Sequence, residues 1–144
     1  MTKASQRAAD IEDAFELIDD WEERYRYVIE LGRELPEFPD ALKSDATKVD
    51  GCVSQVWLRT GAEDGHFHLQ GDSDAMIVRG LVAILIALYD GQPVESVPEL
   101  DAEAFLRRLE LDDHLTPQRS NGLASMVKRV RSDAARLTAA PASS

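Results

Sequence analysis

The sequence predicts a mixed α/β (α+β) domain, with a small antiparallel sheet of about three strands flanked by helices. Apolar and polar residues alternate at 53–59 and 66–70, on either side of a glycine-containing connection at 61–65, which is the pattern of a β-hairpin. The segment 75–89 is apolar almost all round a helical surface and predicts a buried central helix. Gly80 within it predicts a close approach by the sheet. Amphipathic patterns elsewhere supply the flanking helices.

Two helices are predicted before the sheet. Asp10 is expected to cap the first, with residues 1–9 as a flexible terminus. An Asp-Asp pair then interrupts the pattern, and a second helix follows over 21–34. Prolines within 35–39 end this helix, because proline forces the residue before it out of the helical region. The chain then crosses irregularly to a short strand expected at 47–49.

Two helices are predicted after the central one. The first is short and covers 102–109. The last begins at Thr116-Pro117, a capping residue followed by proline at the first helical position, and runs to about residue 137. The tail at 138–144 is expected to be flexible. We therefore predict a single domain over residues 10–137.

Composition and charge exclude several classes of protein. The chain of 144 residues suits one domain with a single core. Its net charge of −11 argues against nucleic acid or an anionic membrane as partner, since both select basic surfaces. One cysteine cannot form an internal disulfide, and the first 30 residues lack the apolar region of a signal peptide. The most apolar run, 76–89, is shorter than the roughly 20 residues of a membrane span. A cytoplasmic protein is expected.

The single cysteine is the first candidate for a functional residue. Cys52 follows Asp50-Gly51, a turn signal, and precedes the strand expected to begin at Val53. A lone cysteine is most often a small buried hydrophobe. Its placement at a turn favours a second interpretation, in which the thiol is presented at the tip of a loop whose ends are held by regular structure.

Two histidines raise the question of a metal site. His66 and His68 stand two apart on one strand face, and Cys52 could be a third ligand. No second cysteine or Cys-x-x-Cys pattern supports a metal. We favour two solvated histidines opposite a buried face of Phe67 and Leu69, and therefore no metal. The sequence has no glycine-rich phosphate loop and no suggestive Ser/His/Asp set, so no cofactor is expected.

Four segments resemble, in the same order, the SufE family of sulfur-acceptor proteins, which includes SufE and CsdE. They are Trp21-Glu22-Glu23-Arg24-Tyr25 leading to Glu30-Leu31-Gly32, then Val49-Asp50-Gly51-Cys52-Val53-Ser54-Gln55-Val56-Trp57-Leu58, then Leu69-Gln70-Gly71-Asp72-Ser73-Asp74-Ala75, and Leu115-Thr116-Pro117-Gln118-Arg119-Ser120-Asn121-Gly122-Leu123. The resemblance covers about residues 10–137. It implies a fold shared with the IscU-type scaffolds.

The resemblance also implies a function in iron–sulfur cluster assembly. A pyridoxal-phosphate-dependent cysteine desulfurase, SufS- or CsdA-like, holds sulfur as a persulfide on its own cysteine. A SufE-like protein takes that sulfur onto its cysteine, here Cys52 by position, stimulates the desulfurase and delivers the sulfur to a SufB-like assembly complex. The positions assigned by resemblance to the loop and to partner docking are Asp50, Gly51, Val53, Ser54, Gln55 and Asp74.

The chemistry of such a transfer can be considered from the residues. The attacking group is a thiolate, whereas an ordinary cysteine with a pKa of about 8.5 is mostly thiol at neutral pH. Asp50 would disfavour the thiolate, so a cation is needed. Arg119, in the first turn of the last helix, is the candidate, with a surface ion pair as the alternative. Arg79 is either a side chain at the rim of the core or a second cation aimed at the loop. We expect the loop to rest inward over an apolar pocket and to swing out at Gly51.

Other functions stay open at this point. The chain could activate a desulfurase without accepting sulfur, or relay sulfur to a pathway other than cluster assembly, as a CsdE-like protein. A cluster scaffold is disfavoured because one cysteine supplies too few ligands. A thiol redox protein is disfavoured because no resolving cysteine is present. In each favoured interpretation the chain is a persulfide carrier or activator rather than a free-standing enzyme.

Overall fold

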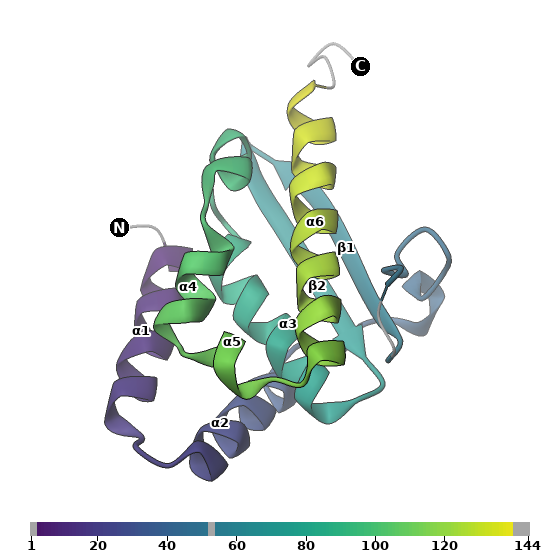
Figure 1. Ribbon diagram of the computed structural model, residues 1–144. Helices are drawn as coiled ribbons and strands as arrows, with labels where there is room; N and C mark the ends of the chain where they lie inside the picture. Colours follow the sequence, from purple (N-terminus) through teal and green to yellow (C-terminus); the bar gives the residue numbers. More distant parts are fainter. Residues whose placement is uncertain (1–2, 52–53, 140–144) are drawn as a thin grey trace.

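The computed structural model describes residues 3–51 and 54–139 (Figure 1). Cys52 and Val53, two of the predicted site residues, lie outside the described residues, as do 1–2 and 140–144. The elements in order are α1 (Lys3–Leu17), α2 (Trp21–Arg33), η1 (Asp40–Leu42), β1 (Val56–Glu63), β2 (His66–Ser73), α3 (Met76–Tyr89), η2 (Val94–Glu99), α4 (Ala102–Arg108), α5 (Leu111–His114) and α6 (Pro117–Ala139).

Strands β1 and β2 form the predicted antiparallel hairpin. Their register runs from Val56 opposite Ser73 to Glu63 opposite His66. The connecting Asp64-Gly65 turn has positive φ at both residues, 54° and 77°, as a tight two-residue hairpin turn requires. Among the described residues β1 begins at Val56, later than the predicted start at 53, and both strands extend further toward their C-terminal ends than predicted.

The expected third strand is reduced to a single bridge. Lys48 pairs with Trp57 on the free edge of β1. Two backbone hydrogen bonds flank this bridge: Val49 N–H donates to the Val56 carbonyl at 2.9 Å, and Leu58 N–H donates to the Thr47 carbonyl at 2.8 Å. The described sheet therefore has two strands rather than about three, and the bridge covers only the first half of the β1 edge.

Helix α3 is the centre of the core, as its apolar sequence predicts. It packs against the inner face of the hairpin, which carries the buried side chains of Val56, Leu58, Phe67 and Leu69. Helix α6 also contacts β1, and α1 and α2 cover α3 from the side away from the sheet (Figure 1). The hairpin, α3 and α6 together form the frame on which the residues around Cys52 are placed.

The crossing of α2 and α3 depends on two glycines. A β-carbon on Gly32 of α2 would lie 2.7 Å from the backbone nitrogen of Gly80 on α3, and one on Gly80 would overlap the carbonyl oxygen of Val28. Gly80 therefore permits a close approach, as predicted, but by α2 rather than by the sheet. Any side chain at this crossing would force the two helices apart.

Side-chain caps lie at the beginnings of α2, α4 and α6, whereas α3 and α5 begin without one. Asp20 and Asp101 accept from Glu22 N and Ala104 N at the beginnings of α2 and α4, and Thr116 Oγ1 accepts from Arg119 N at the beginning of α6. Helix α1 instead begins at Lys3, so Asp10 lies inside it, and its side chain accepts from Gln6 Nε2 at 2.9 Å. The four-residue helix α5 was not predicted.

Candidate functional site

The described residues on either side of Cys52 belong to a short loop closed at its base. The hydrogen bond from Val49 N–H to the Val56 carbonyl joins the two ends of this loop. Gln55, on the C-terminal side, is held through both of its backbone groups. Its N–H donates to Asp74 Oδ1 at 3.0 Å, and its carbonyl accepts from Ser73 Oγ at 2.8 Å. The corner between β2 and α3 thus fixes one side of the loop.

The N-terminal side of the loop lies against α6. Gly51 has φ of 90°, in the left-handed region that favours glycine. A β-carbon at this position would lie 2.6 Å from Ser125 Oγ, so the backbone passes close to the helix. Asp50 and Gly51 are both exposed to solvent. Glycine here satisfies two demands at once, a turn of unusual backbone angle and a close approach to α6.

A cavity of about 220 Å³ opens beside the loop. Its lining residues come from the loop, from α3 and from the first turns of α6: Ser54, Val78, Leu81, Thr116, Gln118, Arg119, Gly122 and Met126. Val78, Leu81 and Met126 are buried and make its interior apolar. The volume exceeds the roughly 30 Å³ that one water molecule occupies in the liquid. The cavity brings together two of the predicted site residues, Ser54 and Arg119.

Arg119 supplies positive charge at this cavity. It lies in the first turn of α6, where its backbone N–H donates to Thr116 Oγ1 at 3.3 Å. Its side chain is exposed, and within residues 3–51 and 54–139 it forms no ion pair. An exposed guanidinium and a helix N-terminus both favour an anion placed at the cavity. Such an environment stabilises a thiolate relative to a thiol.

The other predicted positions have definite roles in the structure. Asp74 does not cap α3, since its carboxylate is engaged with Gln55 N–H. Arg79 forms an ion pair, with its Nε 3.3 Å from Asp72 Oδ1. Asp72, whose side chain is 13% exposed, also pairs with Lys43 at 3.3 Å, and this hydrogen bond raises the pKa of Lys43. The structure favours the rim position for Arg79.

The two histidines lie on the exposed face of β2. Phe67 and Leu69 are buried on the opposite face, as the alternation predicts. His68 lies between Glu63 and Asp90, 3.6 and 3.7 Å from their carboxylate oxygens. In the part of the chain that is described, no group of three or more His, Cys, Asp or Glu side chains is arranged to hold a metal ion. Cys52, the candidate third ligand, is outside that part.

Sequence reasoning missed several residues around the loop. Gln118, Gly122 and Met126 line the cavity, and Ser125 meets Gly51. Their spacing along α6 is the signal that could have found them, because residues three and four apart share one helical face. A larger cavity of about 510 Å³ lies elsewhere, between both strands and residues 35–38. It shares no lining residue with the cavity beside the loop.

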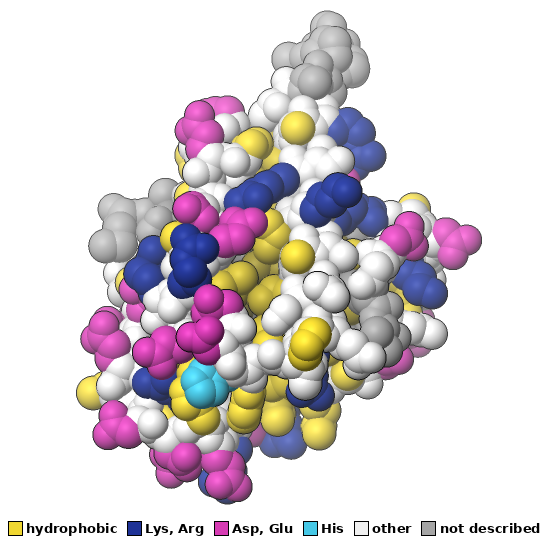
Figure 2. Space-filling model, viewed as in Figure 1, with side chains coloured by type: hydrophobic (Ala, Val, Ile, Leu, Met, Phe, Trp, Pro, Cys, Tyr) yellow, Lys and Arg dark blue, Asp and Glu magenta, His cyan; other side chains and the backbone are white. Residues whose placement is uncertain are grey.

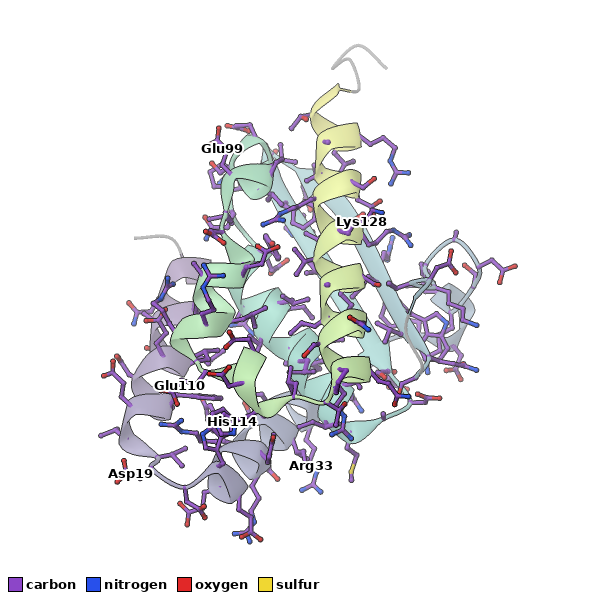
Figure 3. The ribbon with its side chains drawn as sticks, in the orientation of Figure 1. Asp19, Arg33, Glu99, Glu110, His114 and Lys128 are labelled. Atoms are coloured by element: carbon purple, nitrogen blue, oxygen red, sulfur yellow. The ribbon has the colours of Figure 1, made fainter. Side chains whose placement is uncertain are left out.

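The surface around the site differs in charge from the opposite side of the same view. Figure 2 shows acidic side chains gathered over α1, α2 and α5, whereas apolar and basic side chains appear below the beginning of α6. Asp19 and Glu110 belong to the acidic side (Figure 3). On this face, acidic side chains are therefore fewer near the candidate site than over α1, α2 and α5.

Comparison with known proteins identifies the family. A family model described as SufE, Fe-S metabolism associated domain, matches residues 9–134. The chain belongs to the SufE family. Two uncharacterized SufE-like proteins are similar to it over 126 residues: one from Rhizobium meliloti is 48% identical, covering 85% of this chain and 90% of the relative. One from Rhizobium etli is 51% identical, covering 85% of each.

A solved structure supports the fold of this SufE-family chain. The solution structure of a hypothetical protein from Thermus thermophilus matches with a TM-score of 0.77 at 20% identity. The match covers 93% of this chain and 97% of that one. The arrangement of a small sheet and flanking helices is therefore shared across a wide sequence distance. Among the described residues, no helix has both the length and the apolar character needed to cross a membrane.

Proposed function

We propose that this SufE-family protein accepts sulfur from a cysteine desulfurase on Cys52 and passes it on for iron–sulfur cluster assembly. The observation that carries the proposal is the family match over residues 9–134, which is associated with Fe-S metabolism and includes the only cysteine in the chain. The cavity beside Ser54 and the exposed charge of Arg119 support it. They offer an apolar shelter and an anion-stabilising group next to the loop that contains Cys52.

The transfer is a thiol–disulfide type of exchange and needs no external oxidant. The Cys52 thiolate attacks the outer sulfur of a persulfide on the desulfurase. The sulfur–sulfur bond of the donor breaks as a new one forms on Cys52, and the donor cysteine leaves as a thiolate that takes up a proton. A second exchange of the same kind moves the sulfur onward to an acceptor thiol. Electrons and atoms balance at each step.

Three features of the chain have proposed roles in this exchange. Arg119, together with the N-terminus of α6, favours the thiolate and the anionic persulfide. The apolar cavity shelters the persulfide from water. Gly51 serves as a hinge that lets the loop turn outward when the desulfurase docks, and Asp50, Val53, Ser54, Gln55 and Asp74 form part of the docking surface.

The partners follow from the same proposal. The donor is a pyridoxal-phosphate-dependent cysteine desulfurase of the SufS or CsdA type, and the acceptor is a SufB-like assembly complex. The protein is a carrier that stimulates its donor in the cytoplasm, rather than a free-standing enzyme. The acidic net charge disfavours nucleic acid as a further partner.

The first experiment measures intact mass after incubation with a cysteine desulfurase and free cysteine, without reductant. The expected result is a gain of about 32 Da, the mass of one sulfur atom, located on Cys52 and absent in Cys52→Ser. A gain at any other residue, or no gain, would contradict the acceptor role. If wild type and Cys52→Ser both raise desulfurase turnover and neither gains mass, the protein would be an activator instead. Sulfur uptake without delivery to a SufB-like complex would favour a relay to another pathway.

The role of Arg119 is tested in the same assay. Arg119→Gln is expected to slow sulfur uptake at neutral pH and to recover at alkaline pH, where the thiolate forms without help. Arg107→Gln is the matched control, because Arg107 is an exposed cation on α4 that does not line the cavity. Equal rates for both variants at neutral pH would remove Arg119 from the mechanism.

A further inference from the structure

A buried carboxylate on α6 has no part in the site described so far. Asp133 is 3% exposed, and its side chain accepts three hydrogen bonds. Thr60 Oγ1 on β1 donates at 2.8 Å, Arg129 Nε at 3.0 Å, and Arg136 Nη2 at 2.8 Å. Burial of a carboxylate is costly unless it is paired and hydrogen-bonded. This degree of pairing fixes the position of each donor relative to α6.

Arg129 extends this network to the chain that leads to Cys52. While Nε binds Asp133, Nη1 donates to the carbonyl of Lys48 at 3.1 Å, and Nη2 donates to the carbonyl of Ala46. The guanidinium is planar, and its donors point in fixed directions. Arg129 therefore joins a buried carboxylate to two backbone carbonyls of an exposed segment.

The contacts are arranged along one face of α6. Ser125, Arg129 and Asp133 are spaced four residues apart and so lie above one another on the helix. Ser125 is close to Gly51, Arg129 binds residues 46 and 48, and Asp133 binds Thr60 of β1. We call these three residues the α6 anchor. It contacts the segment 46–51 at both ends, directly before Cys52.

We propose that Asp133 and Arg129 are positioning residues that fasten segment 46–51 to α6 and thereby set the reactivity of the Cys52 thiol. A nucleophile reacts at a rate that depends on how narrowly its position is restricted. Residues 46 and 48 are exposed, so water competes for their carbonyl groups at little cost once Arg129 is removed. The effect on sulfur transfer rests on the proposed function. The anchoring of segment 46–51 does not, because it follows from the hydrogen bonds of Arg129 alone.

The anchoring is tested by amide hydrogen exchange. In Arg129→Gln, exchange within 46–51 is expected to rise about tenfold, since hydrogen bonds from a charged group are lost, while exchange in α3 stays unchanged. Lys128→Gln is the control, because Lys128 (labelled on α6 in Figure 3) is exposed and adjacent in sequence. Unchanged exchange at 46–51, or an equal rise throughout the protein, would overturn the proposal.

The link to Cys52 is tested without any partner protein. The rate of alkylation by iodoacetamide is expected to change at least about threefold in Arg129→Gln and to be partly restored in Arg129→Lys, which keeps one charged donor. Lys128→Gln, the control of the exchange experiment, should leave the rate unchanged. An unchanged rate in Arg129→Gln would overturn the link.

A further variant covers the case in which Arg129→Gln does not fold. Asp133→Asn keeps the shape of the side chain but weakens its hold on Arg129, and it is expected to raise exchange at 46–51 in the same direction. If wild-type protein gains no sulfur from a desulfurase, the proposed function fails while exchange and alkylation still decide the anchoring. If wild type gains sulfur but Arg129→Gln behaves like Lys128→Gln, only the anchoring fails.

Discussion

The crossing of α2 and α3 and the segment around Cys52 are held in place by different forces. At the crossing, Gly32 and Gly80 allow backbone contact between helices, and the surrounding side chains of α3 are buried and apolar. The described residues of segment 46–55 are mostly exposed. They are held by hydrogen bonds that Arg129 donates and by one that the Asp74 carboxylate accepts. Tight packing resists any displacement, whereas exposed hydrogen bonds can exchange with water. The α2–α3 crossing should therefore be rigid, whereas segment 46–55 should be able to change position.

The largest effect should come from filling the crossing. In Gly80→Ala the new methyl group would overlap the Val28 carbonyl, so we expect a loss of about 3 kcal/mol in the free energy of unfolding. Gly61→Ala is the control, because a β-carbon there meets no atom within 4 Å. Urea denaturation followed by circular dichroism measures both. Equal stability of the two variants would show that the α2–α3 crossing is not rigidly packed.

A smaller effect is expected at the loop. Gly51→Ala places a side chain at φ of 90° and against Ser125, which should cost about 1–2 kcal/mol. Gly65→Ala, at φ of 77° with open space around it, separates backbone strain from the contact with α6. Hydrogen exchange should rise within 46–51 in Gly51→Ala alone. A rise spread over α3 would show that the loop and the core respond as one unit.

The smallest effect concerns a polar group inside the rigid half. The Tyr89 hydroxyl is buried near Arg131, and its burial raises the pKa of Tyr89 to about 12. Tyr89→Phe should change the free energy of unfolding at pH 7 by less than about 1 kcal/mol.

The sign of the pH dependence gives the clearer measurement. The tyrosine ionises at about pH 10 in the unfolded chain and only at about pH 12 in the folded one. The stability that this group contributes is therefore present below about pH 10 and is lost as the pH rises through about 12. Urea denaturation across this range should show a shallower decline in Tyr89→Phe than in wild type. Parallel curves would contradict it. Burial also raises the pKa of Tyr27, but Tyr27 is present in both proteins and so does not contribute to the difference between them.

Helical periodicity allowed most of the helices to be predicted. Helices α2, α3 and α6 agree with their patterns because their apolar faces have nowhere to pack except the core. Helix α1 starts seven residues before Asp10, since a good capping residue can also sit inside a helix when a neighbour satisfies it. Helix α5 has only four residues, too few for a periodic signal.

The first and last residues of the strands were harder to predict than those of the helices, for a physical reason. Strands pair through backbone groups, which do not depend on the side chain. The ladder therefore continues through Gly61 and through Gly71-Asp72-Ser73, although these residue types are typical of turns and helix caps. The hairpin itself was predictable from alternation. The absence of a full third strand could not be predicted. Over three residues, the sequence pattern of a strand does not differ from that of a single bridge, such as the one at Lys48.

Two local features near the candidate site were predictable, but the contacts that support them were not. The turn at Gly51 and the position of Arg119 follow from local patterns. The hydrogen bonds of Asp74 to Gln55 and of Arg129 to Lys48 join residues 19 and 81 apart in the chain, and no local pattern reports them. Arg79 could not be assigned for the same reason, since its partner Asp72 became evident only in three dimensions.

One contact near the site provides an optical signal. The ammonium of Lys43 lies 4.9 Å from the centre of the Trp57 ring, on the strand that follows Cys52. The other tryptophan, Trp21, stacks on His114 at a different corner of the molecule. In a Trp21→Phe background, Trp57 would be the single indole emitter, and its fluorescence would follow the chain between Lys43 and the bridge at Lys48. Docking and sulfur loading could then be recorded in real time, without attaching a dye to the one thiol that the chemistry requires.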